Sequence, residues 1–534
     1  MASCPSLPIP SVCSSHSCPD IPKSISDDPR IQVLLKCNDP PLEAERLSLL
    51  TTESSSLELL SVLKEKIDNV QQMLKTLLDG QAKVTGNLLA AKALLHPIRS
   101  IPDDVLSYIF SFCVHEVNDL LKQDVVFDSL DSRKPPWTLS QVCRSWRRVT
   151  LSVASLWRCI SLNFQHYREL GRVHVHPFML GLYVQRARHH QLTIRLSSTK
   201  DISSHVFIPV LLSSMPHWKH LRARIPAKSL EVFSTYRGYL ESLHYLDLRQ
   251  PRQDQAKSPI HTFEMAQNLR VLSIGSTLCR HIYLPDGGKA LTELLIRGPF
   301  VKHIFSFLRK MPNIEKLYLY FEDSKPFERL STPITMPKLV TLLIAEWNGA
   351  APFSIAHLFE SLELPALSDL YFNLDDQEND STVLLFPEIL PHHHCHEINR
   401  LTVTAPESEI GKTGLIKVLT HIINMQHLTV SAKIVDKELL SALTRSGNND
   451  DILPRLRTFD LRESDTIPNS KILLEMVESR MKGQTGNGEQ EEGVIELRML
   501  EEVYLGEPLT FDDPSLASRW QSLQSNGLVV YDGN

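Results

Sequence analysis

The sequence predicts an α/β multidomain protein in which helical N-terminal segments precede a solenoid of strand-and-helix repeats. Three observations indicate this fold class. An apolar seam with heptad spacing runs through residues 42–96, and a compact stretch rich in tryptophan and cysteine fills residues 97–165. A pattern of three apolar residues then recurs through residues 166–534. A chain of 534 residues is long enough for two to four domains, at about 150 residues per domain.

The composition is that of an ordinary globular protein, with 42% hydrophobic and 22% charged residues. The net charge is −6, whereas nucleic-acid-binding domains are typically basic, so we expect no nucleic-acid partner. No apolar run approaches the roughly 18 residues that span a membrane, and the N-terminus lacks the pattern of a signal peptide. Nine cysteines are few for this length and odd in number. We therefore expect reduced thiols in the cytoplasm, the nucleus or both.

Residues 1–41 are rich in serine and proline and carry no apolar period, which is typical of a disordered tail. Four cysteines lie in this tail, at Cys4, Cys13, Cys18 and Cys37. None belongs to a Cys-x-x-Cys pair with a matching partner pair, so we interpret them as incidental thiols and not as metal ligands.

Residues 42–96 are predicted to form a long helix whose apolar residues alternate at spacings of three and four. Only Gln81 interrupts this seam, and the helix is expected to end before Pro97. The seam indicates burial but does not say against what. Self-association as a coiled coil and packing against the rest of the chain both remain open. The seam consists of Leu60, Leu63, Ile67, Val70, Leu74, Leu77, Gln81, Val84, Leu88, Ala91 and Leu95.

Residues 97–165 contain two apolar stripes at helical spacing. Pro102 suits the first turn of a helix, and a domain this small does not bury all of its apolar groups. The stripes alone are typical of the core of a small helical domain, with a partner-binding face as the alternative. The first stripe consists of Val105, Leu106, Ile109 and Phe110, and the second of Val142, Trp146 and Val149.

The same residues fall into an ordered motif. Its pieces are Ile101-Pro102-Asp103-Asp104-Val105-Leu106, Ile109-Phe110, Val142-Cys143-Arg144-Ser145-Trp146-Arg147 and Leu156-Trp157. This segment, about 60 of the 534 residues, resembles the F-box. It departs from the F-box pattern in two ways: Ile101 stands where leucine is usual, and an insertion rich in charge and proline, residues 114–136, separates the first two helices.

The resemblance implies that the chain docks on a Skp-family adaptor, and through it on a cullin-containing ubiquitin ligase. The ligase chemistry would then occur on other subunits, so the chain is expected not to be an enzyme. We predict that the adaptor-binding face carries Pro102, Val105, Leu106, Ile109, Val142 and Trp157. The full set of adaptor-binding residues that the motif implies is Ile101, Pro102, Val105, Leu106, Ile109, Phe110, Val142, Cys143, Trp146, Leu156 and Trp157.

From residue 243 onward the form apolar-x-x-apolar-x-apolar occurs ten times. The first six units begin 22 to 28 residues apart, which matches the 20–29-residue period of leucine-rich repeats. The last two apolar residues of each unit alternate as a strand requires, and further strands are expected near residues 192–196 and 221. The units begin at Leu243, Leu269, Leu291, Ile314, Leu339, Leu367, Ile398, Met425, Leu456 and Leu500.

This array resembles the irregular leucine-rich solenoids of many ubiquitin-ligase receptors. It departs from the strict repeat where Thr277, Glu322 and Trp347 replace the usual asparagine or cysteine. The order of helix, F-box and solenoid is similar to that of fungal F-box proteins. The resemblance implies a substrate-recognition subunit whose solenoid binds an unknown protein substrate. The alternative is a coiled-coil scaffold that uses the solenoid as an interaction platform without a ligase role.

Residues between the apolar positions are expected to face outward from the solenoid strands. Aromatic side chains are favoured anchors for a partner, although Trp347 can instead belong to the core. The substrate-binding candidates are Tyr318, Tyr320, Trp347, Tyr371 and Asn373.

We expect neither a cofactor nor a metal. The run His392-His393-His394-Cys395-His396 resembles a metal cluster, but adjacent residues do not all point at one ion. We interpret it as an exposed loop between repeats. The run Gly411-Lys412-Thr413-Gly414 lacks the first glycine of a phosphate-binding loop, because Pro406 stands there. The polar segment 481–493 is predicted to be a loop within the last repeat.

Overall fold

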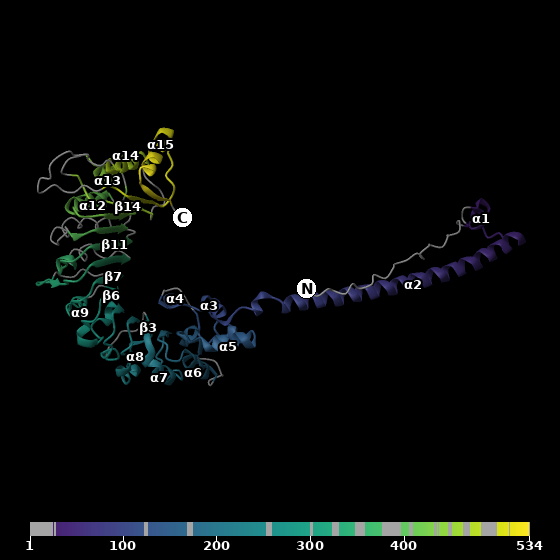
Figure 1. Ribbon diagram of the computed structural model, residues 1–534, viewed down its shortest axis with the longest axis horizontal. Coiled ribbons are helices and arrows are strands. Elements are labelled where there is room, and N and C mark those ends of the chain that lie inside the picture. Colours follow the sequence, from purple (N-terminus) through teal and green to yellow (C-terminus); the bar gives the residue numbers. More distant parts are fainter. Residues whose placement is uncertain are drawn as a thin grey trace, which may run out of the picture. The chain divides into compact units, whose positions relative to one another are not determined.

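The fold comes from a computed structural model, which describes residues 25, 28–121, 127–167, 175–251, 259–299, 303–322, 330–347, 358–375, 397–404, 409–431, 435, 437–446, 451–462, 470–481, 499–511 and 513–532. The chain divides into two compact units, Met1–Pro102 and Asp103–Asn534 (Figure 1). Each unit is described by itself.

The first unit consists of a short helix, α1 (Pro29–Leu34), and a long helix, α2 (Glu43–Leu94). The backbone N–H of Leu42 donates to the Glu45 carboxylate at 2.9 Å, which satisfies a donor at the start of α2. At 52 residues, α2 is about 78 Å long. It is one continuous helix and none of its side chains is buried. The predicted long N-terminal helix is therefore confirmed.

The second unit begins with a small group of helices, called here the helical module. It consists of α3 (Asp103–Cys113), α4 (Val117–Leu121) and α5 (Arg144–Ser152), with 3-10 turns η3 (Thr138–Gln141) and η4 (Ala154–Trp157). Helices α3 and α5 pack on each other: the rings of Phe110 and Trp146 lie 4.8 Å apart, and Arg148 pairs with Asp103 at 2.8 Å.

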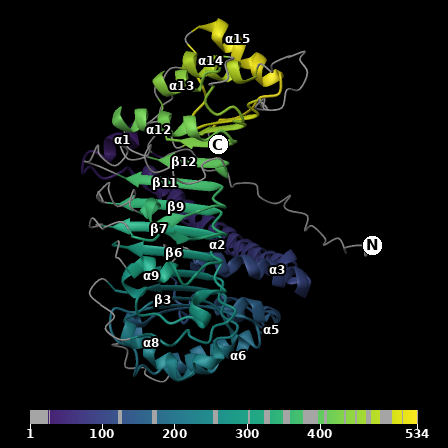
Figure 2. The same cartoon turned by 90° about the vertical axis from the view of Figure 1, so that its left-hand side faces the viewer.

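The rest of the second unit is a solenoid built on one parallel sheet of 14 strands, which pair almost entirely in chain order (Figure 2). The predicted solenoid is confirmed at this level, and each of the ten predicted repeat units supplies one strand from β4 to β15. The strands are β1 (Cys159–Asn163), β2 (Leu192–Ser197), β3 (Trp218–Arg224), β4 (Tyr245–Arg249), β5 (Val271–Gly275), β6 (Glu293–Gly298), β7 (Lys316–Glu322), β9 (Thr341–Trp347), β11 (Asp369–Asp375), β12 (Arg400–Thr404), β13 (His427–Val430), β14 (Thr458–Leu461), β15 (Glu502–Leu505) and β16 (Val529–Asp532).

The core lies on one face of this sheet. The second apolar residue of each repeat unit pairs with its counterpart on the next strand, so that together they form an unbroken ladder. Every member of the ladder is fully buried, as stacked repeats require. The ladder consists of Leu246, Leu272, Leu294, Leu317, Leu342, Leu370, Leu401, Leu428, Phe459 and Val503.

Helices cover the buried face of the sheet. Figure 1 shows the strands along the inner side of the arc, with helices such as α8, α9 and α12 on its outer side. The opposite face of the sheet, called here the concave face, carries the side chains between the buried positions. The helices of the solenoid are α6 (Val175–Ala187), α7 (Ile208–Ser214), α8 (Ala227–Ser234), α9 (His303–Leu308), α12 (Glu409–His421), α13 (Lys437–Leu443), α14 (Ser470–Met481) and α15 (Pro514–Ser525).

Two strands extend the sheet beyond the predicted repeats. Strand β1 opens it, although its residues fall within the 97–165 segment that the sequence assigned to the helical domain. Strand β16 closes the described sheet beside β15. Two further strands, β8 (Ile334–Thr335) and β10 (Leu362–Glu363), form a separate short pair.

Candidate functional site: an apolar helix face and a concave sheet

Helix α3 divides its apolar side chains between two faces. Leu106 and Phe110 point inward and are 2% and 0% exposed. Val105, Tyr108, Ile109 and Phe112 are 45%, 66%, 40% and 70% exposed, at the i, i+3, i+4 and i+7 spacing that places them on one side of a helix. The rings of Tyr108 and Phe112 contact each other edge to face at 4.8 Å. This exposed apolar stripe is called here the α3 face, and such a surface typically marks an interaction site.

The start of α5 is shaped by its cysteine. The Cys143 sulfur accepts from the backbone N–H of Trp146 at 3.5 Å and so caps the helix. Val142, one residue earlier, is 60% exposed. The Trp146 ring is half-buried because it packs on Phe110 of α3. The cysteine and tryptophan of the motif therefore organise the helix, while the valine beside them is exposed.

Trp157 joins the helical module to the first solenoid repeat. Its ring is fully buried, and its indole N–H donates to the Thr150 carbonyl at 2.9 Å. It packs edge to face on Trp137 and on Tyr183 of α6, at 5.0 Å in both cases. The Arg186 guanidinium lies 4.5 Å from the Trp157 ring centre, a cation–π geometry. The module and the solenoid consequently share one core.

The candidate adaptor-binding residues thus fall into two groups in the structure. Leu106, Phe110, Leu156 and Trp157 are buried inside the unit and hold its helices together. Val105, Ile109, Val142, Cys143 and Pro102 are exposed, and Ile101 and Trp146 are half-buried. Sequence reasoning missed Tyr108 and Phe112, which continue the exposed stripe of Val105 and Ile109; their helical spacing was the available signal.

The described part of the insertion between the first two helices folds onto the solenoid. It contains α4, whose Leu120 is fully buried and which packs against β1 and β2. The Arg222 guanidinium of β3 donates to the carbonyls of Leu120 and Leu121 at 3.3 and 2.6 Å. The described part of the insertion therefore lies at the N-terminal end of the concave face.

The substrate-binding candidates lie on the concave face, in two adjacent rows. Tyr318 and Tyr371 flank Leu343 in one row, and Tyr320 and Asn373 flank Ala345 in the next. Asn373 is exposed and the three tyrosines are half-buried. Trp347 is the last residue of β9, and its side chain lies outside the described part of the structure. The structure thus brings four of the five candidates together at one place.

Partial burial changes the chemistry of this aromatic cluster only modestly. It raises the pKa of the hydroxyl groups of Tyr318 and Tyr320, so both remain neutral donors at neutral pH. The Arg297 guanidinium lies 5.3 Å from the Tyr320 ring centre and adds a positive charge beside the cluster. A surface of this kind suits a partner that offers apolar groups and hydrogen-bond acceptors.

Within the described ranges, no group of three or more His, Cys, Asp or Glu side chains is placed to hold a metal ion. The run His392 to His396 and the segment 482–493 lie outside those ranges. Among the helices that the structure describes, none combines the length and the apolar character needed to cross a bilayer.

The fold defines the class of protein: a solenoid of parallel strands fused to a small helical module. No protein-family model and no curated protein sequence matches the chain. Among solved structures, a protein from Bacteroides fragilis is similar at 12% identity and a TM-score of 0.28, over 55% of this chain and 74% of that one. Rad7, from the Rad7–Elc1 complex of yeast, is similar at 12% identity and a TM-score of 0.30, over 73% of this chain and 94% of that one. TLR13, from a complex with single-stranded RNA, is similar at 11% identity and a TM-score of 0.24, over 54% of this chain and 45% of that one.

Proposed function

We propose that this chain is the substrate-recognition subunit of a Skp–cullin–F-box ubiquitin ligase. In this role the helical module is the F-box and docks a Skp-family adaptor, while the concave face of the solenoid holds a protein substrate. The chain itself performs no chemistry: it positions the substrate for transfer of ubiquitin on other subunits, which raises the effective concentration of the acceptor. Free thiols at all five described cysteines fit a reducing compartment, the cytoplasm or the nucleus.

The α3 face is the observation that carries this proposal. Four large apolar side chains remain 40–70% exposed on one helix, directly after the Ile-Pro-Asp-Asp start of the motif. Burying each of them against a partner would contribute about 1–2 kcal/mol. The buried residues of the motif support the proposal in a different way, because they fix the helices that present this face.

The shared core around Trp157 supports the second half of the proposal. A recruiting subunit has to hold its substrate at a defined distance from the adaptor, and a flexible joint would lose that geometry. Trp137, Trp157 and Tyr183 pack across the junction between helical module and solenoid, and Arg186 lies over both tryptophan rings. A partner bound on the concave face would therefore be held at a fixed place relative to the α3 face.

The test is adaptor binding by a variant with the α3 face made polar. We expect Ile109→Asp combined with Phe112→Asp to weaken binding of the Skp-family adaptor at least 100-fold, because each removes an anchor worth roughly 2 kcal/mol. Both side chains are exposed in the free chain, so the fold should survive. Phe178→Asp is the matched control, since Phe178 on α6 is 66% exposed but lies outside the motif.

Isothermal titration of the full-length chain with the adaptor measures the affinities, and circular dichroism confirms that each variant is folded. Unchanged binding by the folded double variant would show that the α3 face is not the interface. No binding by the unmodified chain would remove the ligase role altogether. Equal losses in Phe178→Asp and the double variant would mean that surface charge alone weakens the complex.

The exposed seam of α2 favours a second candidate, a scaffold that assembles through a coiled coil and has no ligase role. Seam residues such as Ile67, Leu74 and Leu77 are 54%, 55% and 66% exposed. The adaptor titration separates the two candidates, because a scaffold would show self-association without adaptor binding.

A further inference from the structure

The last strand of the described sheet, β16, has one unpaired edge. It bonds to β15 on its inner side, where the backbone N–H of Val529 donates to the Glu501 carbonyl at 3.0 Å. Backbone groups alternate sides along a strand, so those of Val530 and Asp532 point to the outer edge. No described residue pairs with them. A row of unpaired donors and acceptors of this kind is a template for another strand.

The opposite edge of the same sheet is closed by one residue of the insertion, Ser129. Its backbone N–H donates to the Ser161 carbonyl of β1 at 3.0 Å, and its hydroxyl accepts from the Ser161 N–H at 2.8 Å. The Ser129 hydroxyl also donates to the Cys159 carbonyl at 3.4 Å. These outward backbone groups of β1 are thus satisfied within the chain, whereas those of β16 have no partner among the described residues.

The apolar core is also open at the β16 edge. Val530 pairs with Val503, the last member of the buried ladder, but is itself only half-buried because no strand follows it in the described sheet. Val529 and Tyr531, on the concave face, are 44% and 46% exposed. The terminal repeat of a solenoid needs a polar outer surface to remain soluble. The apolar residues of β16 therefore form an edge that a further strand would bury.

Planar side chains on the concave face form a stack that leads to this edge. The guanidinium of Arg462, which directly follows β14, lies 4.3 Å from the centre of the Tyr504 ring on β15. The Tyr504 ring lies 4.4 Å from the Tyr531 ring on β16, at an interplanar angle of 8°. The stack thus takes one planar group from each successive strand. Tyr531 is its last member among the described residues, so an added strand would supply the next one.

The charges around the stack favour a cationic partner. The cation within the stack, Arg462, is already paired with Asp460 at 2.8 Å. Glu502 accepts from the Tyr504 hydroxyl at 3.2 Å, and Asp532 lies exposed at the edge itself. Neither Glu502 nor Asp532 forms an ion pair with a described residue. Two uncompensated carboxylates beside an exposed ring suit a guanidinium, because this group combines a positive charge with a planar stacking surface.

We propose that the outer edge of β16 binds an extended segment of another protein as an added strand, with an arginine of that segment stacked on Tyr531. The backbone of Val530 and Asp532 supplies hydrogen bonds, and the side chains determine which segment binds. An aliphatic residue next to the arginine would cover Val530 and extend the buried ladder by one strand. The partner class is a strand-forming peptide in which arginine and aliphatic residues are adjacent. The proposal requires neither the adaptor nor a ligase role.

The experiment measures binding of a fluorescein-labelled peptide to the full-length chain by fluorescence anisotropy. The probe is Gly-Ser-Thr-Val-Arg-Val-Thr-Ser-Gly, and three counterparts carry lysine, phenylalanine or serine in place of the arginine. The test variants are Tyr531→Ser, which removes the stacking surface, and Val530→Pro, which removes an outward N–H but no bond to β15. Tyr239→Ser is the matched control, because Tyr239 is 55% exposed and lies on the 3-10 turn η7 (Arg237–Tyr239), which precedes β4.

Circular dichroism confirms that each variant is folded. If Val530→Pro is unfolded, Tyr531→Ser decides the question, because the Tyr531 side chain is exposed and its loss should leave the fold intact.

We expect the arginine peptide to bind the unmodified chain at least tenfold more tightly than the serine and lysine peptides. Tyr531→Ser and Val530→Pro should each weaken its binding at least tenfold, and Tyr239→Ser should not change it. The proposal is overturned if the arginine peptide does not bind, if the lysine or phenylalanine peptide binds equally well, or if a folded test variant binds as the unmodified chain does. A dimer that Val530→Pro dissociates in sedimentation would also overturn it, because a second copy would then occupy the edge.

Discussion

The apolar seam of α2 leads to a quantitative prediction about self-association. Seven large seam residues between residues 60 and 88 are more than half exposed in the single chain. Replacing Ile67 and Leu74 by lysine places a charge at two positions of the regular first half of the seam. If two α2 helices pair, these charges cannot be buried unpaired, and the double variant should be monomeric where the unmodified chain is dimeric.

The expected size of the effect follows from the exposure of the seam. Full burial of a leucine or isoleucine contributes about 1.5–3 kcal/mol, so a side chain that is half exposed has roughly 1 kcal/mol left to gain. Fourteen such side chains in a dimer would gain roughly 14 kcal/mol, against an association cost of about 4–15 kcal/mol. The double variant removes four of them, or roughly 4 kcal/mol, which corresponds to about a 1,000-fold weaker dimer.

Sedimentation equilibrium of the full-length chain over a range of concentrations measures this directly. The matched control is Glu65→Lys combined with Gln72→Lys, which places lysines on the opposite side of the same helix at f positions. Circular dichroism shows whether α2 remains helical in each variant. The control should dimerise like the unmodified chain.

Two results would refute the reasoning. An unmodified chain that sediments as a monomer at every concentration would show that the exposed seam does not pair between chains. A double variant that dimerises as tightly as the unmodified chain would place the dimer interface elsewhere, for example on the α3 face.

Two further predictions concern stability. Leu106→Ala should lower the free energy of unfolding by about 2–5 kcal/mol in urea titrations, because Leu106 is 2% exposed, whereas Val105→Ala at 45% exposure should lower it by less than about 1 kcal/mol. Burial, with Lys219 and His244 nearby, lowers the pKa of His220 to about 4, below the unfolded value of 6.5. The full stability is thus present above pH 6.5 and falls as the pH drops toward 4. Because the His220 side chain is partly exposed, we expect this group to lower the free energy of unfolding by about 1–2 kcal/mol between pH 6.5 and pH 4. Urea titrations at several pH values measure this loss, and His220→Gln should remove it.

The repeat pattern was the most informative part of the sequence. In a stacked solenoid every repeat buries the same positions, so the spacing of Leu243, Leu246 and Leu248 recurs unit after unit and predicts the strands directly. Strand β16 gave no such signal because it lies at the edge of the described sheet: Val529 and Tyr531 are 44% and 46% exposed. Strand β1 was missed for another reason. It follows the buried Trp157 directly and its first four residues, 159–162, are all buried, so it lacks the alternation of buried and exposed residues that marks a strand.

The motif in the helical module contains both core and surface residues and does not separate them. Leu106 and Ile109 are three residues apart and both apolar, yet the first is 2% and the second 40% exposed. Helical spacing places them near each other, but the boundary between the buried and the exposed side depends on where α5 packs. That boundary depends on contacts such as Phe110 with Trp146, which join segments 36 residues apart in the sequence.

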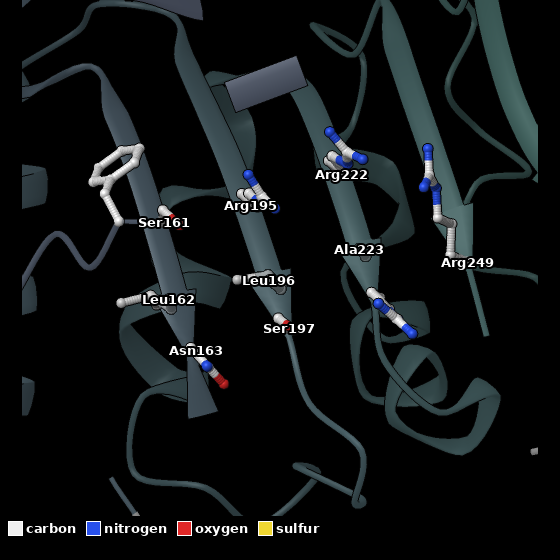
Figure 3. A pocket seen from close by; sticks show the side chains of 11 residues that line it. Ser161, Leu162, Asn163, Arg195, Leu196, Ser197, Arg222, Ala223 and Arg249 are labelled. Carbon is white, nitrogen blue, oxygen red and sulfur yellow. The ribbon is translucent and has the colours of Figure 1, made fainter. Parts of the chain in front are cut away.

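The gathering of Arg195, Arg222 and Arg249 on one face of the sheet (Figure 3) could not be predicted from the sequence. Arg195, Arg222 and Arg249 lie 27 residues apart in succession, and each on its own looks like an ordinary polar residue of a strand. They meet because consecutive strands pair with the register that the buried leucines impose. The role of the insertion was equally hidden, since only the structure shows the carbonyls of Leu120 and Leu121 accepting from Arg222.

Because the strands pair in regular order, the number of strands between two positions on the concave face fixes the distance between them. Six strand-to-strand steps separate β3, which carries Arg222 and Arg224, from β11, which carries Tyr371 and Asn373. At about 4.8 Å per step, Arg222 and Arg224 lie roughly 29 Å from Tyr371 and Asn373 along the sheet. An extended polypeptide advances about 3.3 Å per residue, so a segment that touched both sites would need about nine residues between its two contact points. For a partner segment that contacts both places, the number of repeats would thereby set the length of the segment as well as its chemistry.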